Sequence, residues 1–322
     1  MKKISFLLLI LCLILVGCET EPQKITEEPE TVPSSAPADR VFLRDVSIEG
    51  ITYLLYSDNT AEAVEIEQAS LVPKELVMPT YIDEQFAVIS LADELFQDIV
   101  ITEITLPEKL LAIGDRTFRH SAIERITIPD SVTKIGRDAF TSCQNLTEAH
   151  LGEGLITVPV GAFFSCPRLS RITLPQGLLH IEEEAFGDLP LLEEIQLPQG
   201  VESIGAYAFW KTGTESLSLS IPDSVKQIGA NAFAETAFLK AQTDEFVIVG
   251  DGVLILYQGS KTSLNLPQTV KFISNAFDFS PVTDLTVPDS VTGVAKDAFA
   301  ESRITTFFYS EENQILGSLL KK

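Results

Sequence analysis

One stretch decides the fold, and residues 126–140 show it in full as ITIPDSVTKIGRDAF. It joins an alternating Ile-Thr-Ile run, a proline, an Ile-Gly pair and a closing Ala-Phe. Repetition at a period of about 20 to 29 residues is the signature of a solenoid with one coil per repeat. The sequence therefore predicts a repeat solenoid, whose partners would bind an extended surface. The closing phenylalanine returns at intervals of 22 to 24 residues, apart from one interval of 44: Phe96, Phe118, Phe140, Phe163, Phe186, Phe209, Phe233, Phe277 and Phe299.

Each repeat is predicted to begin with a short strand. In residues 126–128 apolar side chains alternate with a threonine, which is typical of a half-buried strand, and the following proline has no N–H and ends it. The later Ile is often followed by glycine, as in Ile135-Gly136. Because Pro159 takes the same place in another repeat, a left-handed backbone is not the reason. Close packing or the start of a short helical turn would explain the glycine. The phenylalanines are interpreted as an internal spine.

This repeat resembles the leucine-rich repeat of the BspA-like, or Treponema pallidum-type, class. Residues 169–175 (LSRITLP) and 192–198 (LEEIQLP) follow its strand pattern, and residues 130–140 follow its second half. The similarity covers about residues 76–310. The resemblance implies short parallel β-strands on the concave face, with irregular or short helical segments on the convex face. It also implies a bacterial surface protein that binds host or microbial macromolecules.

The N-terminus has the pattern of an export signal. Two lysines precede an apolar run at residues 4–16, which is too short to cross a membrane. The run ends in LVGC, which resembles the lipobox of bacterial lipoproteins. That resemblance implies removal of residues 1–17 and lipidation of Cys18, with palmitate-type acyl chains. An ordinary secretory signal with an incidental cysteine is the alternative. Residues 18–40 are rich in Glu, Pro, Thr and Ser and predict a disordered tether.

Two stretches depart from the period, and each predicts a β-hairpin. Residues 41–76 contain two strand-like runs around a polar turn and are expected to cap the first coil. An Asp-Gly turn at residues 251–252 predicts a hairpin inside an insertion at 238–262. That hairpin is either structural or a projecting contact element. The solenoid is predicted over 77–310 with about nine coils, and 311–322 are predicted to form a tail.

Charge and motif content exclude several functions. The formal net charge is −23, whereas proteins that bind nucleic acid need clustered Lys and Arg side chains. His120, His150 and His180 occupy three different places in the repeat and lack metal-ligand spacing. The sequence has neither a Gly-rich phosphate loop nor a nucleophile elbow. We therefore expect no nucleic-acid partner, no cofactor, no metal and no enzymatic activity.

Two cysteines lie in the repeats themselves. Cys143 and Cys166 each follow a spine phenylalanine by three residues, in adjacent coils. Buried free thiols are expected there, because the position should face inward. A disulfide is the alternative, because stacked positions approach closely enough and an exported protein meets oxidising conditions.

Two columns of outward side chains on the strands are the candidate partner-binding surface. A parallel in-register sheet stacks equivalent residues about 4.8 Å apart. The first column alternates in charge, as a strip for a partner or as a ladder that avoids like-charge stacking. The second column is short and polar until Phe308, which is an exposed anchor or is covered by the tail. Trp210, in a loop, is a further possible anchor. The candidate residues are Glu103, Thr105, Arg125, Thr127, Glu148, His150, Arg171, Thr173, Glu194, Gln196 and Phe308.

These features together predict a non-catalytic surface lipoprotein. We expect a monomer, attached to the membrane through its N-terminal lipid, that binds a protein or a glycan through the concave sheet. Adhesion or host–microbe interaction would be its role. A periplasmic lipoprotein that serves envelope structure or assembly is the alternative.

Overall fold

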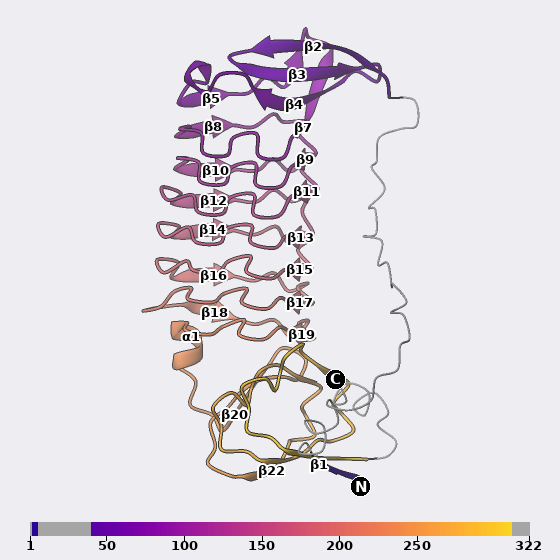
Figure 1. The fold of residues 1–322 in the computed structure, drawn as a ribbon, viewed down its shortest axis with the longest axis vertical. Coiled ribbons are helices and arrows are strands. Elements are labelled where there is room, and N and C mark those ends of the chain that lie inside the picture. Colours follow the sequence, from indigo (N-terminus) through magenta and orange to yellow (C-terminus); the bar gives the residue numbers. More distant parts are fainter. Residues whose placement is uncertain (1, 6–39, 311–322) are drawn as a thin grey trace, which may run out of the picture.

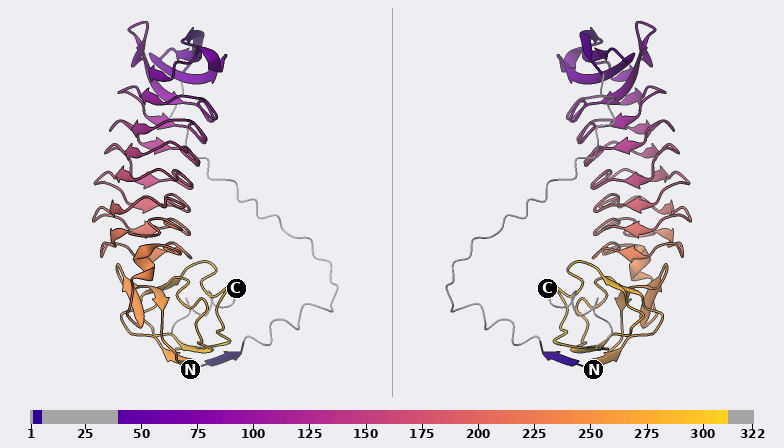
Figure 2. Two further views of the ribbon diagram at one scale, coloured as in Figure 1. Left: turned by 90° about the vertical axis from the view of Figure 1, so that its left-hand side faces the viewer. Right: turned by 90° about the vertical axis from the view of Figure 1, so that its right-hand side faces the viewer.

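The computed structural model describes residues 2–5 and 40–310, which wind into a stack of β-coils (Figure 1). Side chains are described for residues 40–310. Most of the expected signal peptide and tether, and the whole expected tail at 311–322, lie outside the described residues. Figure 2 shows that the stack is gently bowed.

Two columns of parallel strands run along the two sides of the stack (Figure 1). We call them the long-strand column and the short-strand column. The long-strand column consists of β5 (Glu75–Val77), β8 (Glu103–Thr105), β10 (Arg125–Thr127), β12 (Glu148–His150), β14 (Arg171–Thr173), β16 (Glu194–Gln196), β18 (Ser218–Ser220), β22 (Ser263–Asn265), β24 (Asp284–Thr286) and β26 (Thr306–Tyr309). The short-strand column includes β9 (Ala112–Ile113), β11 (Lys134–Ile135), β13 (Thr157–Val158), β15 (His180–Ile181), β17 (Ser203–Ile204), β19 (Gln227–Ile228), β23 (Phe272–Ile273) and β25 (Gly293–Val294).

The sequence predicts the first of these columns but not the second. Each short strand ends at the Ile, or at Val158 or Val294 in its place, that precedes the position where glycine is frequent. A strand therefore stands where a short helical turn was considered. The close-packing explanation of the glycine is confirmed at Gly136. Its φ is not positive, and a Cβ there would overlap the backbone nitrogen of Asp115 in the preceding coil. Glycine thus lets two coils approach at the end of the short strand.

The long strands pair in register, which fixes the side chains that stand beside one another. Arg125 is opposite Glu148, and Glu148 is opposite Arg171. At the end of the stack, Thr286 is opposite Phe308. The strand β1 (Lys2–Ser5) lies antiparallel to β26 on its other side.

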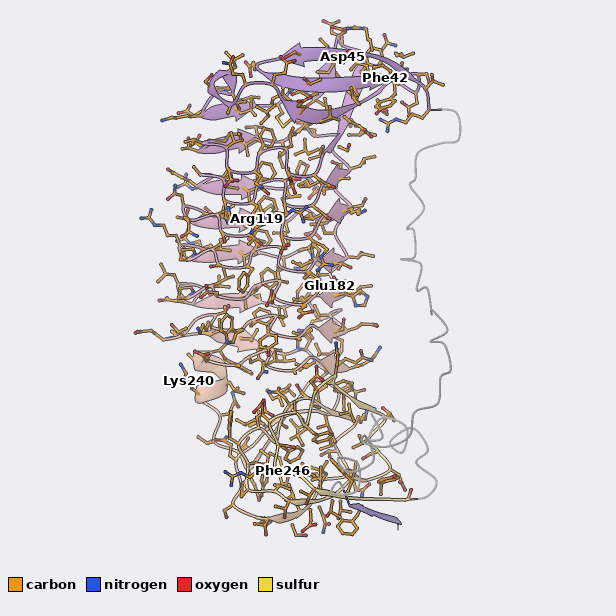
Figure 3. The ribbon with its side chains drawn as sticks, viewed as in Figure 1. Phe42, Asp45, Arg119, Glu182, Lys240 and Phe246 are labelled. Atoms are coloured by element: carbon orange, nitrogen blue, oxygen red, sulfur yellow. The ribbon has the colours of Figure 1, made fainter. Side chains whose placement is uncertain are left out.

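The repeating phenylalanines form the expected internal spine. From Phe96 to Phe233, neighbouring ring centroids are 5.0–6.0 Å apart. All nine rings are buried except that of Phe299, which is partly exposed. In the enlarged unit, Tyr257 supplies an aromatic ring that the repeat pattern did not reveal, 5.9 Å from Phe277. Figure 3 shows the side chains that fill the space between the two columns.

Two left-handed residues flank each spine ring from Phe96 to Phe233, and one lies beside each of Phe277 and Phe299. Around Phe140 they are Asp138, with φ 54°, and Ser142, with φ 60°. The same conformation recurs two residues before or after the other spine rings, at Glu94, Asp98, Arg116, His120, Gly161, Ser165, Glu184, Asp188, Tyr207, Lys211, Asn231, Glu235, Phe279 and Asp297. Val, Ile and Thr do not occur in this set, because a β-branched side chain strongly disfavours positive φ.

An antiparallel unit stands at the N-terminal end of the stack. The strands β2 (Phe42–Ile48), β3 (Ile51–Tyr56) and β4 (Thr60–Ile66) pair in that order. The strand β4 then lies parallel to β7 (Phe86–Leu91), which continues into the short-strand column through β9. The sequence indicated the β3–β4 hairpin. It did not indicate β2, the strand β6 (Tyr81–Ile82) paired with β7, or the 3₁₀ turn η2 (Ala69–Leu71).

A second antiparallel unit interrupts the stack after the short helix α1 (Ala237–Lys240). The strands β20 (Phe246–Val249) and β21 (Val253–Tyr257) form the hairpin that the Asp-Gly turn indicated, and β21 lies parallel to β23. The hydrophobic core divides here into a larger cluster on the N-terminal side and a smaller one on the C-terminal side. The hairpin is therefore the junction between two packed stacks.

Candidate functional site

The charged column on the long strands is exposed to solvent, and few of its side chains form ion pairs with one another. Arg125 and Glu148 form an ion pair at 3.8 Å between Nε and Oε2, with side chains 71% and 47% exposed. Such an exposed pair stabilises a fold by about 0–1 kcal/mol. Within residues 40–310, Arg171 has no acidic partner within 4.0 Å. The ladder interpretation therefore accounts for one contact, and the guanidinium of Arg171 is available to a ligand. The outer members Glu103 and Glu194 are also exposed.

The polar column beside it is equally open. Thr105, Thr127, His150, Thr173 and Gln196 are all exposed, as the register predicts. The Gln196 side chain donates a hydrogen bond from Nε2 to Oε1 of Glu194, at 2.9 Å.

Phe308 ends the polar column as predicted, beside Thr286. It is partly exposed, whereas its neighbours Phe307 and Tyr309 are only 5% and 8% exposed. Phe308 is thus a weaker anchor than a fully exposed ring would be. The tail residues considered as its cover lie outside the described residues.

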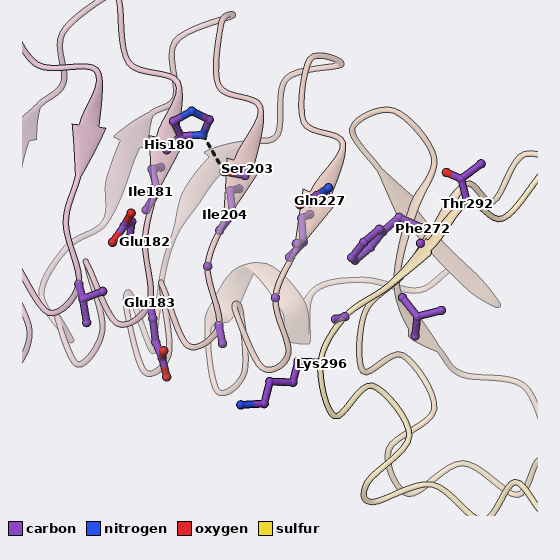
Figure 4. A pocket seen from close by; sticks show the side chains of 18 residues that line it. His180, Ile181, Glu182, Glu183, Ser203, Ile204, Gln227, Phe272, Thr292 and Lys296 are labelled. Atoms are coloured by element: carbon purple, nitrogen blue, oxygen red, sulfur yellow. Dashed lines mark hydrogen bonds between the residues drawn. The ribbon is translucent and has the colours of Figure 1, made fainter. Parts of the chain in front are cut away.

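A groove of about 920 Å³ lies over the short-strand column, and the sequence gave no indication of it (Figure 4). It extends across strands on both sides of the β20–β21 hairpin. His180, Ser203 and Gln227 follow one another on successive strands along it, and Nδ1 of His180 lies 2.9 Å from Oγ of Ser203. Phe272 and Lys296 lie on its C-terminal side. One sequence signal for a recess is the small residues that follow two of its strands, Gly205 and Ala206 after β17 and Gly229 after β19.

The two cysteines of the repeats are free and buried, which confirms the expectation of free thiols. The Sγ–H of Cys143 donates to the backbone oxygen of Phe118, and that of Cys166 to the backbone oxygen of Phe140, both at 3.1 Å. The neighbouring Cys143 thiol and burial raise the pKa of the Cys166 thiol. A buried thiol of raised pKa is a packing group and a poor nucleophile. The expected lipid-bearing Cys18 lies outside the described residues.

Clusters of metal-binding side chains and membrane-spanning helices are both absent from the described part of the chain. Within residues 40–310, no group of three or more His, Cys, Asp or Glu side chains could hold a metal ion. His150 lies on β12, His180 on β15 and His120 in a loop, where its Nδ1 contacts Oδ1 of Asp98 at 3.1 Å. Across residues 2–5 and 40–310, no helix has the length and apolar character to cross a bilayer.

Trp210, singled out in the sequence, lies on the loop side of the stack and is partly exposed. Its indole Nε1 donates to Oε1 of Glu235, at 3.2 Å. Two further aromatic side chains, Phe164 and Tyr207, lie next to it. The sequence did not single these two out, because Phe164 directly follows a spine residue and Tyr207 occupies a place that other repeats give to polar residues.

Several solved bacterial proteins are similar to this chain. A leucine-rich repeat protein from Eubacterium ventriosum is 22% identical, with 65% of this chain and 53% of that chain covered and a TM-score of 0.53. This chain thus spans about half of that protein. A leucine rich cell surface protein from Faecalibacterium prausnitzii is 24% identical over 80% and 73% of the two chains, with a TM-score of 0.45. The leucine-rich repeat protein of T. pallidum is 19% identical over 86% and 95%, with a TM-score of 0.36.

Family membership follows from the repeats themselves. Among curated proteins, none is similar enough to count as a match. The BspA type leucine rich repeat region matches with six copies, at residues 80–189, 111–240 and 203–320. These matches cover most of the chain and the whole stack of coils after the N-terminal unit. The chain belongs to the family of proteins that carry the BspA-type leucine-rich repeat region.

Proposed function

We propose that this chain is a non-catalytic lipoprotein of the bacterial cell surface that binds a protein through the exposed face of its long-strand column. One observation carries the binding proposal. The in-register strands hold two columns of charged and polar side chains at fixed spacing, and most of these side chains make no contact with one another. A partner can therefore pair with them without first breaking internal contacts. Arg171 is the favoured centre, because arginine is enriched among residues that dominate binding energy.

The binding proposal is tested by reversing the charge of the two arginines. Arg125→Glu with Arg171→Glu should weaken binding to an immobilised panel of extracellular matrix proteins by at least about tenfold, because both charges face the partner. The matched control is Lys109→Glu with Lys134→Glu, which changes the net charge equally away from this face. Equal affinities of the two double variants for every bound protein would move the site off the long-strand column.

The location part of the proposal rests on the sequence alone. The LVGC motif and the Glu/Pro-rich segment after it support export, lipidation at Cys18 and a tether that holds the solenoid clear of the membrane. Cys18→Ser should abolish incorporation of labelled palmitate and release the protein from the membrane fraction. Added protease should degrade the native protein on intact cells. Protection from that protease would refute surface display and favour a role inside the envelope.

A further inference from the structure

Two of three successive coils carry aromatic groups that the repeat does not require. The residue after the spine phenylalanine is Phe164, Gly187 and Trp210 in these coils. Elsewhere the same place holds Gln97, Arg119, Thr141, Ala234, Asp278 and Ala300. Because those coils stack equally well without an aromatic ring at this place, packing of the solenoid does not explain Phe164 and Trp210. Tyr207 is a similar exception, two residues before its spine ring.

The three aromatic side chains form one surface feature, the aromatic ridge, made of Phe164, Tyr207 and Trp210. The rings of Phe164 and Trp210 are parallel within 8°, with centroids 6.5 Å apart. They come together over Gly187, where a Cβ would lie 3.0 Å from the ring of Phe164. The ring of Tyr207 is 6.4 Å from that of Trp210 and perpendicular to it, at 89°. Two parallel faces and one upright ring thus make a corner that is partly open to solvent.

Hydrogen-bonding groups surround this corner. Glu235 accepts from the Trp210 indole, and the Lys211 ammonium lies 4.2 Å from the centroid of the Trp210 ring. Glu184 occupies the place equivalent to Tyr207 in the preceding coil. Burial, and then the charge of Glu183, raise the pKa of Glu184. The ridge therefore combines aromatic rings with one ammonium group beside Trp210 and carboxylate oxygens at its edge.

The ridge continues into a small pocket at the junction of the two stacks. Asn231 donates from Nδ2 to the Tyr207 hydroxyl at 3.2 Å, and it also lines this pocket of about 170 Å³. Asn275 lines the pocket too, and its Nδ2 donates to Asn231 at 2.7 Å and to Oδ2 of Asp278 at 2.8 Å. The other carboxylate oxygen of Asp278 is buried and has no hydrogen-bond partner within residues 40–310. Phe279, at the pocket, is 84% exposed.

An unpaired buried acceptor is unfavourable unless a ligand or water donates to it. The acceptor of Asp278 therefore calls for a donor such as a hydroxyl group. The faces of the aromatic rings in the ridge carry partial negative charge, which attracts the weakly positive C–H groups of a sugar ring. Lys211 is the one cation named at the ridge, and Glu184, Glu235 and the net charge of −23 outweigh it, so anions are repelled. Many hydroxyl donors, an apolar C–H face and no negative charge describe a neutral pyranose.

We propose that the aromatic ridge and the junction pocket together bind a neutral oligosaccharide. One sugar ring lies against Trp210 and Phe164, and a neighbouring hydroxyl group donates to Asp278. This site is separate from the long-strand face, so it gives the protein a second ligand class.

Trp210 provides the assay, because it is the one tryptophan of the chain. The full chain is titrated with cellohexaose, maltohexaose, mannohexaose and chitohexaose, and the indole fluorescence is followed. At least one of these neutral hexasaccharides should give a saturable change, and polygalacturonate should give none. Phe164→Ala and Asp278→Ala should each weaken that affinity at least about tenfold. The matched control Tyr81→Ala, which removes a 47% exposed ring at β6, should leave the affinity unchanged.

Circular dichroism and the melting temperature show whether each variant folds, and Phe164→Leu keeps the bulk of the side chain if Phe164→Ala does not. The proposal is overturned if none of the four hexasaccharides saturates, if polygalacturonate binds best, or if folded ridge variants bind sugar like the native chain. Loss of a protein partner in the ridge variants, without any sugar response, also overturns it. Arg125→Glu with Arg171→Glu should not alter the sugar titration, so the two sites can fail independently.

Discussion

Replacement of Phe140 by alanine is the most direct test of the spine. Its ring is fully buried and lies parallel, within 5°, to those of Phe118 and Phe163, at 5.2 and 5.0 Å. Removal of a buried phenylalanine side chain destabilises a protein by about 3–5 kcal/mol. Each lost ring pair is worth about 0.5–1.5 kcal/mol beyond burial. With a partner on both sides, we expect a loss near the upper end, about 4–5 kcal/mol.

Urea unfolding followed by far-ultraviolet circular dichroism measures this loss, and Phe299→Ala is the matched comparison. Phe299 is partly exposed and near the end of the stack, with Phe277 at 6.2 Å and Phe307 at 5.0 Å. Its removal should cost about 2 kcal/mol, because less surface returns to water. The fluorescence of Trp210 follows the part of the stack before the β20–β21 hairpin, whereas circular dichroism follows the whole stack. Coincident transitions would show that the parts before and after the hairpin unfold together. If Phe140→Ala were no more destabilising than Phe299→Ala, the spine would not be the main source of stability.

Three further outcomes are expected. Gly136→Ala should destabilise the fold by about 1–3 kcal/mol through overlap with the preceding coil, whereas Gly177→Ala, which meets open space, should change stability by less than about 1 kcal/mol in the same urea titration. Thiol labelling of Cys166, mapped by mass spectrometry, should be slow until the protein unfolds, because the adjacent Cys143 and burial raise its pKa, and rapid native labelling would contradict this. Burial raises the pKa of Asp278, so the folded state binds the carboxyl proton more tightly than the unfolded state does. The melting temperature of the native chain should therefore rise relative to that of Asp278→Asn as the pH falls from about 7 to about 4. A constant or falling difference between the two melting temperatures would contradict this shift.

The regular part of the fold could be predicted because its period and alternation are strong. The repeat fixes the spine, and the alternating strand residues fix the register that places Thr127 beside His150. The short strands could not be foreseen, since two residues such as Lys134–Ile135 are too few to show any alternation. The groove was hidden for another reason. It depends on how the two stacks meet at the β20–β21 hairpin, which no local pattern encodes.

Of the two candidate binding surfaces, one could be predicted from the sequence and the other could not. The polar columns were predictable in position, because register alone brings Arg125 and Glu148 together. The aromatic ridge was not, because Phe164 and Trp210 are 46 residues apart and meet only over the missing side chain of Gly187. A search for places where one repeat departs from all the others would have found both rings.

The left-handed residues beside each spine ring also restrict how this surface can evolve. Apart from the buried Gly161, they lie on loops that are at least partly exposed, where substitutions are usually tolerated. A β-branched residue in place of Asp138 or Tyr207, however, would lower the free energy of unfolding by about 1–3 kcal/mol through backbone strain, whatever its neighbours. Charged, polar and aromatic residues are free to exchange there, while Val, Ile and Thr are excluded. Natural drift, or a randomised library, can therefore change the ligand of this face without disturbing the coils, provided that it omits those three residues and proline, whose ring fixes φ near −65°.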